Sequence, residues 1–340
     1  MRDDHMESYD VFLSVGSDNV SCRPAGYLGY HNLRQYAAPL DWMQNYSLDT
    51  VIQLFQTSFS TFFANILEDG EYKGKHEDNR QVIDVTNHII SKHHFNKNIP
   101  LEDSQKEFVA KMRRRYTILD NKLKTSDTLM LIGSRGDDRK ELESFLFRFS
   151  GLYTNLRITL MNIRNDSGMD HTDVYSKKYE LSEKLAIVEY FFNDSSIPGE
   201  GYPWLGNDRI WNSILDNYCL TDNHAVENAF EKLKEKVAGR NAVLYGTGES
   251  GMELLHMLGR YGMKVKGFAV SDGRKKSSEY RGLPVSTIEG YSKDDVILIA
   301  LRIQSESSAV RKTLLSKGYN NIVGLDYGTV PNIEDIQQIL

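Results

Sequence analysis

The sequence predicts an α/β protein built from two domains. Apolar, β-branched stretches alternate with amphipathic stretches along the chain, which is the pattern of strands and helices around a mainly parallel sheet. The chain has 340 residues, more than one average domain holds. A charged helical stretch that ends at Gly239 is followed by a new strand, turn and helix. We therefore expect a first domain over residues 1–222, a linker helix over 223–239 and a smaller second domain over 240–340.

The first domain is expected to begin with a strand over residues 9–14, where the sequence YDVFLS is largely apolar. A helix over 22–35 follows, with Pro24 in its first turn, where the missing N–H costs nothing. Residues 101–123 have apolar positions at helical spacing and charges elsewhere, so they predict a long amphipathic helix. Further strands are expected at 81–85, 127–133, 155–163 and 184–192, and further helices at 47–65, 137–150 and 206–217.

The second domain is expected to be Rossmann-like. A strand leads into the turn Gly246-x-Gly248-x-x-Gly251, a helix follows, and the next strand ends beside Asp272, about 20 positions further on. Such a turn accepts phosphate because the glycines allow close approach and the helix N-terminus offers unpaired N–H groups. Alternatively, the glycines only allow the helix to pack tightly on the sheet. Two more strands complete about one mononucleotide-binding half, which argues against a dehydrogenase.

Composition excludes several classes of function. A net charge of −6, without a basic block or tail, argues against a nucleic-acid binder. No stretch has the length of apolar residues that a membrane span needs, and the polar start lacks a secretory signal, so we expect a cytoplasmic protein. Two cysteines, Cys22 and Cys219, do not make a disulfide framework. No motif of the metal-binding type is present, and we expect no metal.

Cys22 stands where the first strand is followed by the first helix. A helix N-terminus stabilises an anion, so we expect a lowered thiol pKa and a nucleophilic cysteine. Ser17, Asn19 and backbone amides near the turn are candidates to stabilise an oxyanion. The alternative is a small buried thiol without chemistry.

A nucleophilic cysteine needs a base, and the best candidates lie in the segment NHIISKHHF, which contains His88, His93 and His94. In an extended segment His93 and His94 point to opposite sides, so at most one of them faces Cys22. The alternative is that these are surface or interface histidines.

Several motifs in order resemble a bacterial family of unknown function whose members are described as papain-like cysteine peptidases. The resemblance covers about residues 9–220. It rests on a strand that ends in SVG, on Cys22, on PLDW with Asp41, on SKHHF with His93, and on the paired Arg114 and Arg115.

This resemblance implies that Cys22 is the nucleophile and His93 the general base. His94 replaces the acid that usually follows the histidine in the family, so Asp41 becomes the candidate to orient His93. Arg114 and Arg115 are candidates to contact an anionic group of the substrate. The alternative is that Arg114 and Arg115 lie on a solvated face of the helix and bind no substrate.

Residues 240–325 resemble the small nucleotide-binding head of bacterial sugar acyltransferases. The match rests on the glycine turn, Gly267-Phe268, Asp272 and the sequence GLPV at 282–285. It implies that Gly246, Gly248, Gly251 and Asp272 bind a nucleotide, a nucleotide-sugar or coenzyme A.

Three functions remain open. The first is a cysteine-dependent acyl hydrolase or acyltransferase acting on a small molecule or a glycan, in glycan or surface-polysaccharide metabolism. The second is a transferase that uses an activated sugar or a coenzyme A thioester, with Cys22 only shaping the pocket. The third is a nucleotide-binding or regulatory protein without catalysis. The sequence leaves the oligomeric state open.

Overall fold

The computed structural model describes residues 6–17, 22–34, 37–69, 78–197, 203–222, 224–275, 277–301 and 304–324. The chain divides into two compact units. The first comprises Met1–Leu28, Tyr36–Ser196 and Pro203–Thr221, and the second comprises Gly29–Gln35, Ile197–Tyr202 and Asp222–Leu340.

The first unit contains a five-stranded sheet that carries most of its core. Its strands follow the order β2-β7-β8-β10-β9, in which the first four are parallel and β9 is antiparallel to β10. They are β2 (Val11–Ser17), β7 (Thr128–Ser134), β8 (Arg157–Asn165), β10 (Leu185–Phe192) and β9 (Val174–Glu180). A further parallel pair joins β1 (Glu7–Tyr9) to β11 (Tyr218–Leu220). The predicted mixture of helices with parallel strands is confirmed.

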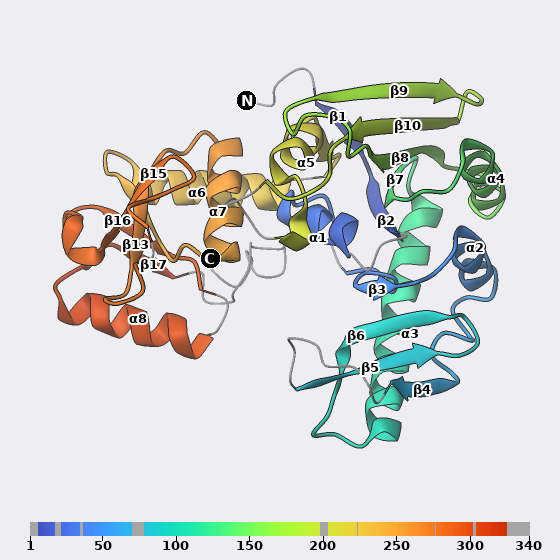
Figure 1. Cartoon of the computed structure of the whole chain (residues 1–340), viewed down its shortest axis with the longest axis horizontal. Helices are drawn as coiled ribbons and strands as arrows, with labels where there is room; N and C mark the ends of the chain where they lie inside the picture. The colour runs from blue at the N-terminus through green and yellow to red at the C-terminus, as the bar shows by residue number, and fades with distance from the viewer. Residues whose placement is uncertain are drawn as a thin grey trace. The chain divides into compact units, whose positions relative to one another are not determined.

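A second, fully antiparallel sheet was not expected from the sequence. Its order is β3-β6-β5-β4, and its strands are β3 (Met43–Gln44), β6 (Ile89–Asn96), β5 (Asn79–Asp84) and β4 (Ile66–Asp69). The long helix α3 (Leu101–Thr125) lies against β6 and runs from this sheet towards the five-stranded one (Figure 1). Stacked and edge-to-face contacts among Phe63, Phe95 and Phe108 join the helix to the sheet.

The remaining helices of the first unit are α1 (Arg23–Tyr30), α2 (Leu48–Gln56), α4 (Arg139–Ser150) and α5 (Asp208–Leu215). The prediction of one helix over 47–65 was too long. Ser47 caps α2 at its start, as expected for a serine. Beyond the helix, Ser58 and Phe59 have positive φ angles of 52° and 56°, and this left-handed backbone cannot continue an α-helix.

The second unit is a six-stranded sheet with helices on both faces. The order is β14-β15-β13-β12-β16-β17, parallel except for β14 at the edge. The strands are β14 (Glu279–Tyr280), β15 (Leu283–Thr287), β13 (Val265–Val270), β12 (Ala242–Tyr245), β16 (Val296–Ile299) and β17 (Ile322–Gly324). The helices are α6 (His224–Val237), α7 (Glu249–Arg260) and α8 (Gln304–Ser316).

Side chains of β12 alternate between the two cores of this unit. Ala242 and Leu244 pack with residues of α7 such as Leu258, whereas Val243 and Tyr245 pack on the side of α8. This period of two is the pattern of a strand buried on both faces.

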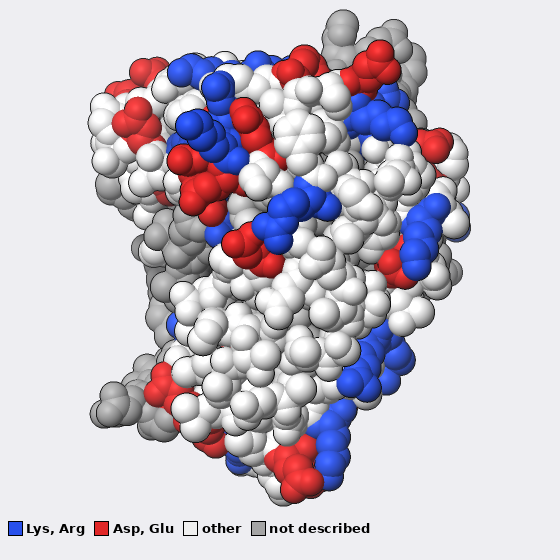
Figure 2. Space-filling model, turned by 90° about the vertical axis from the view of Figure 1, so that its right-hand side faces the viewer, with Lys and Arg blue, Asp and Glu red and all other residues white. Residues whose placement is uncertain are grey.

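The surface carries charges of both signs. Figure 2 shows acidic and basic side chains next to one another over the face that it displays, separated by uncharged surface. None of the helices within the described ranges combines the length and the hydropathy that a bilayer crossing requires.

Candidate functional site

Cys22 lies directly before α1. Its carbonyl oxygen accepts a hydrogen bond from the backbone N–H of Gly26 at 3.1 Å, which makes Cys22 part of the first helical turn. The thiol remains partly exposed. Its Sγ lies 4.0 Å from the backbone oxygen of Met43 and accepts a hydrogen bond from the Gln44 side-chain amide at 3.7 Å. The two residues of β3 therefore form one wall around the sulfur.

The expected lowering of the Cys22 pKa was wrong. Burial raises the pKa of this thiol to about 11, and the charge of Asp41 raises it further. The hydrogen bond from Gln44 and the charge of Lys92 act in the opposite direction. The cost of removing a thiolate from water thus outweighs its stabilisation by the helix N-terminus. The thiol is therefore protonated at neutral pH.

Arg23 fixes the first residue of α1. Its Nε donates to the backbone oxygen of Trp204 at 2.9 Å, and its guanidinium forms an ion pair with the carboxylate of Asp194. Only 15% of the Arg23 side chain and 4% of the Asp194 side chain are exposed. Asp194 also accepts a hydrogen bond from Trp211 Nε1 at 2.9 Å. The residue next to the thiol is therefore held by a buried network.

Asp41 and Trp42 come immediately before β3. Asp41 is 1% exposed, and its Oδ2 accepts a hydrogen bond from the backbone N–H of Ala38 at 2.8 Å, which closes the turn that leads to the strand. Trp42 has a φ of 67°, a left-handed conformation that is rare for a bulky residue and often marks a functional site. Its indole ring lies 6.3 Å from the His93 ring and 6.4 Å from the Trp204 ring, measured between centroids.

His93 thus lies close to the segment that surrounds the sulfur. Trp42, which touches the His93 ring, is followed directly by the two residues that contact Cys22 Sγ. β3 also pairs with β6, the strand that carries His93. Asp41 and Trp42 therefore directly precede the strand that contacts Cys22 Sγ, and His93 lies beside Trp42 on the strand paired with it.

A bulge interrupts β6 at the histidines. Ser91 pairs with Val82 of β5 and Phe95 with Arg80, so the three residues 92–94 lie opposite the single residue Gln81. Bulges of this kind redirect side chains and are common beside active sites.

The two neighbouring histidines have different surroundings. His94 Nδ1 and Ser91 Oγ share a hydrogen bond at 3.0 Å, and the His94 ring packs at 5.2 Å from Phe108. Burial lowers the His94 pKa to about 3, and the charges of Lys111 and Arg115 lower it further. Both histidines are partly exposed, but His94 is neutral and packed against Phe108, whereas His93 lies beside Trp42.

The other predicted substrate-binding residues fall into two groups. Asn19 and the side chain of Ser17 lie outside the described residues. Arg114 is exposed on α3, while Arg115 is partly buried, with Nη1 4.0 Å from Met112 Sδ and its charge acting on His94. The two arginines therefore occupy different environments on the same helix.

Sequence reasoning missed two buried polar residues of the segment that contacts Cys22, namely Gln44 and Tyr46. Gln44 is 7% exposed and contacts the sulfur, and Tyr46 is 7% exposed with its ring against Gly16. Their only signal in the sequence is their place directly after the PLDW motif. The pairing of β3 with β6, which carries Gln44 to the sulfur, is a long-range contact that no local pattern indicates.

In the second unit a cavity of about 840 Å³ lies at the carboxyl ends of the parallel strands. Gly246, Gly248, Ser271 and Arg274 are among its lining residues. Gly248 precedes α7 and has no side chain to cap it. Position 251 must be glycine, because a Cβ there would lie 2.1 Å from the Gly246 carbonyl oxygen.

Asp272 is not part of the lining of this cavity. Its side chain is 76% exposed, and Lys317 Nζ lies 4.0 Å from its Oδ2.

These features define an α/β unit with a cysteine at the start of a helix, joined in one chain to a parallel-sheet unit with a glycine turn. A family model described as "Putative papain-like cysteine peptidase (DUF1796)" matches residues 10–153. Apart from Gly29–Gln35, this range lies in the first unit, and it includes Cys22, Asp41 and His93. No curated protein and no protein of solved structure matches the chain.

Proposed function

We propose that the first unit is a cysteine-dependent acyl hydrolase or acyltransferase, with Cys22 as the nucleophile and His93 as general base and acid. The contact of the Gln44 amide with Cys22 Sγ carries the proposal, because it places a buried N–H donor at the reacting atom. The similarity of residues 10–153 to the peptidase family supports it.

In the first step the Cys22 sulfur attacks the acyl carbonyl carbon while His93 takes the thiol proton. A sulfur–carbon bond forms and the carbonyl π pair moves to oxygen. When this intermediate collapses, the leaving group departs with the proton from His93. Water or an acceptor hydroxyl, deprotonated by His93, then attacks the thioester and releases Cys22 as a thiol after proton return. A thiol with a pKa of about 11 needs this base, because it does not ionise by itself near pH 7.

The remaining residues have supporting roles in this proposal. Asp41 orients His93 through the turn that it closes and through Trp42. Gln44, and on the proposal Ser17 and Asn19, donate to the oxyanion. Arg114 and Arg115 contact an anionic group of the substrate.

For the second unit we propose a Rossmann-like domain that binds a nucleotide, a nucleotide-sugar or coenzyme A. The order β15-β13-β12-β16-β17 and the cavity beside Gly246 and Gly248 support this, since ligands of open α/β sheets bind at the carboxyl ends of the strands. Asp272 would have to turn away from Lys317 to reach a ribose. Such a ligand favours a role in glycan or surface-polysaccharide metabolism over protein degradation.

One observation favours a second candidate function, in which Cys22 shapes the pocket of a transferase without forming a covalent bond. The raised pKa of Cys22 is the normal property of a buried structural thiol. In that case Cys22→Ser retains activity.

The test uses p-nitrophenyl acetate and intact-protein mass spectrometry. We expect an acetyl adduct on Cys22 in the natural chain and in the matched control Cys219→Ser, none on Cys22→Ala, and slower formation in His93→Gln. Absence of an adduct on Cys22 at every pH, or full esterase turnover by Cys22→Ser, rejects the nucleophile.

Calorimetry of the full chain with ADP, UDP, UDP-glucose and coenzyme A tests the second unit, with Gly248→Val as the non-binding variant.

A further inference from the structure

The chain makes a tight turn directly after β13, at the wall of the cavity in the second unit. The backbone N–H of Arg274 donates to the backbone oxygen of Ser271 at 3.0 Å. Gly273, within this turn, has a φ of 77°, a conformation that glycine adopts without strain. Ser271 and Arg274, the two ends of the turn, both line the cavity of about 840 Å³.

Asp272 has the sequence spacing of a ribose-binding acid but does not line the cavity. Its side chain is 76% exposed, and its Oδ2 lies 4.0 Å from Lys317 Nζ. The lining residue at the end of β13 is instead Ser271, whose Oγ shares a hydrogen bond with the Tyr245 hydroxyl at 2.9 Å. This strand end therefore offers a neutral side chain where an acid would bind the free hydroxyls of a ribose.

Arg274 adds a positive charge at the same place. Its side chain is exposed, and no carboxylate among the described residues forms an ion pair with it. A guanidinium group binds a phosphate through two parallel, charge-assisted hydrogen bonds. In Rossmann-type sites, an arginine near the end of this strand is the residue that accommodates a phosphate on the ribose.

The acidic residue of the cavity wall lies on the other side of the glycine turn. Glu306 belongs to α8, which packs on β16 and β17, whereas β13 lies on the opposite side of β12. Gly246 and Gly248 follow β12, the strand between the two sides. On the side of β13, Tyr280 and Val285 line the cavity with apolar surface against which a base can lie.

We propose that the second unit binds a nucleotide whose ribose carries a phosphate monoester, and that Arg274 recognises this phosphate. The glycine turn then takes the 5′-phosphate, and nucleotides with free ribose hydroxyls, such as ADP, UDP and UDP-glucose, bind less tightly. Coenzyme A carries such a phosphate on the 3′ oxygen, and the phosphorylated nicotinamide dinucleotides carry it on the 2′ oxygen. This inference rests on the proposed nucleotide-binding function of the second unit.

The test is calorimetry of the full-length chain with three ligands that differ only in the ribose phosphate, namely 5′-AMP, adenosine 2′,5′-bisphosphate and adenosine 3′,5′-bisphosphate. We expect one bisphosphate to bind about tenfold or more tightly than 5′-AMP, because a charge-assisted contact is added. The preferred isomer distinguishes the coenzyme A type from the dinucleotide type. If both bisphosphates bind within about twofold of 5′-AMP, this inference is overturned and the nucleotide-binding function stands. If none of the three ligands binds, that function is rejected and the inference with it.

Two variants assign the preference to a residue. Arg274→Gln changes an exposed side chain and should remove the preference for the bisphosphate without lowering the urea midpoint. The matched control is Lys275→Gln, which removes the same charge one position later, from a residue that does not line the cavity, and should keep the preference. A preference that survives in Arg274→Gln, or that is lost equally in both variants, would reject recognition by Arg274.

Discussion

The side-chain amide of Gln44 lies 3.7 Å from the sulfur of Cys22 and is almost completely buried. Gln44 belongs to β3, which pairs with β6, the strand that carries His93. One short strand therefore joins the thiol to the segment with the proposed base. A donor held rigidly in a water-poor site costs no reorganisation when charge develops near it, which is the main requirement for stabilising an oxyanion.

Replacing Gln44 separates this electrostatic role from packing. Gln44→Leu keeps the volume and removes the donor, so formation of the acetyl adduct on Cys22 should slow on the order of 10²-fold. Gln44→Glu adds a carboxylate near Asp41 and should raise the thiol pKa further. Single-turnover mass spectrometry measures both. Equal adduct rates in Gln44→Leu and the natural chain would show that the amide only packs against the sulfur.

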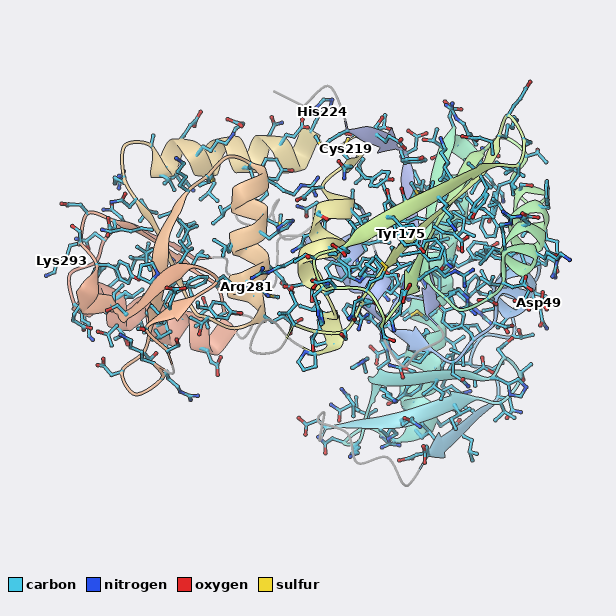
Figure 3. All side chains as sticks on the ribbon, turned by 45° about the horizontal axis from the view of Figure 1, so that its top comes forward. Asp49, Tyr175, Cys219, His224, Arg281 and Lys293 are labelled. Carbon is cyan, nitrogen blue, oxygen red and sulfur yellow. The ribbon has the colours of Figure 1, made fainter. Side chains whose placement is uncertain are left out.

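The pH dependence of Cys22 alkylation follows from its raised pKa. With a pKa of about 11 instead of 9.0, the thiolate fraction and the iodoacetamide rate should rise about tenfold per pH unit up to about pH 11. Cys219, which is 5% exposed on β11 (Figure 3), should stay unlabelled, and Cys219→Ser is the control. A rate that levels off below pH about 8 would mean that an unrecognised group stabilises the thiolate.

The sequence predicts the alternating elements well where apolar runs are long, as in the strand at 127–133 and the helix at 101–123. It fails for β3, β4 and β6, because these strands are short or contain charged and histidine residues, and their pairing is antiparallel and non-local. The place of Cys22 before the first helix made it a candidate nucleophile, and the resemblance to the peptidase family singled out His93 among the histidines. The raised pKa of the thiol comes mainly from its burial, and Met43 and Gln44 contact the sulfur through tertiary packing that a helix-terminus argument does not include.

The ion pair between Arg23 and Asp194 should dominate the stability of the α1 start. Arg23→Ala leaves a buried carboxylate without its cation, which should lower the free energy of unfolding by about 3–5 kcal/mol in urea titration. Asp194→Asn should cost less, because the amide can still accept from Trp211 Nε1. The double variant Arg23→Met/Asp194→Asn should recover part of the loss. A loss below about 1 kcal/mol in Arg23→Ala would mean that the pair is effectively solvated.

His94 should make the folded state sensitive to mild acid. Its folded pKa is about 3 and its ordinary value is 6.5, so below pH 6.5 the unfolded chain binds a proton that the folded chain does not. The contribution is complete above pH 6.5 and is lost progressively as the pH falls towards 3. His94→Gln, which cannot titrate, should therefore show a smaller fall in urea midpoint between pH about 7 and about 5 than the natural chain.

The neighbouring variant His93→Gln serves as the control for this measurement, because it changes the same residue type one position earlier. It should keep the acid-dependent fall in the urea midpoint and form the acetyl adduct more slowly, whereas His94→Gln should show a smaller fall and keep the rate of adduct formation. The reason is that His94 is packed against Phe108 and bonded to Ser91, while His93 borders Trp42 beside the thiol. If both variants lost adduct formation equally, both histidines of the β6 bulge would be required for the reaction. The assignment of the base to His93 alone would then be wrong.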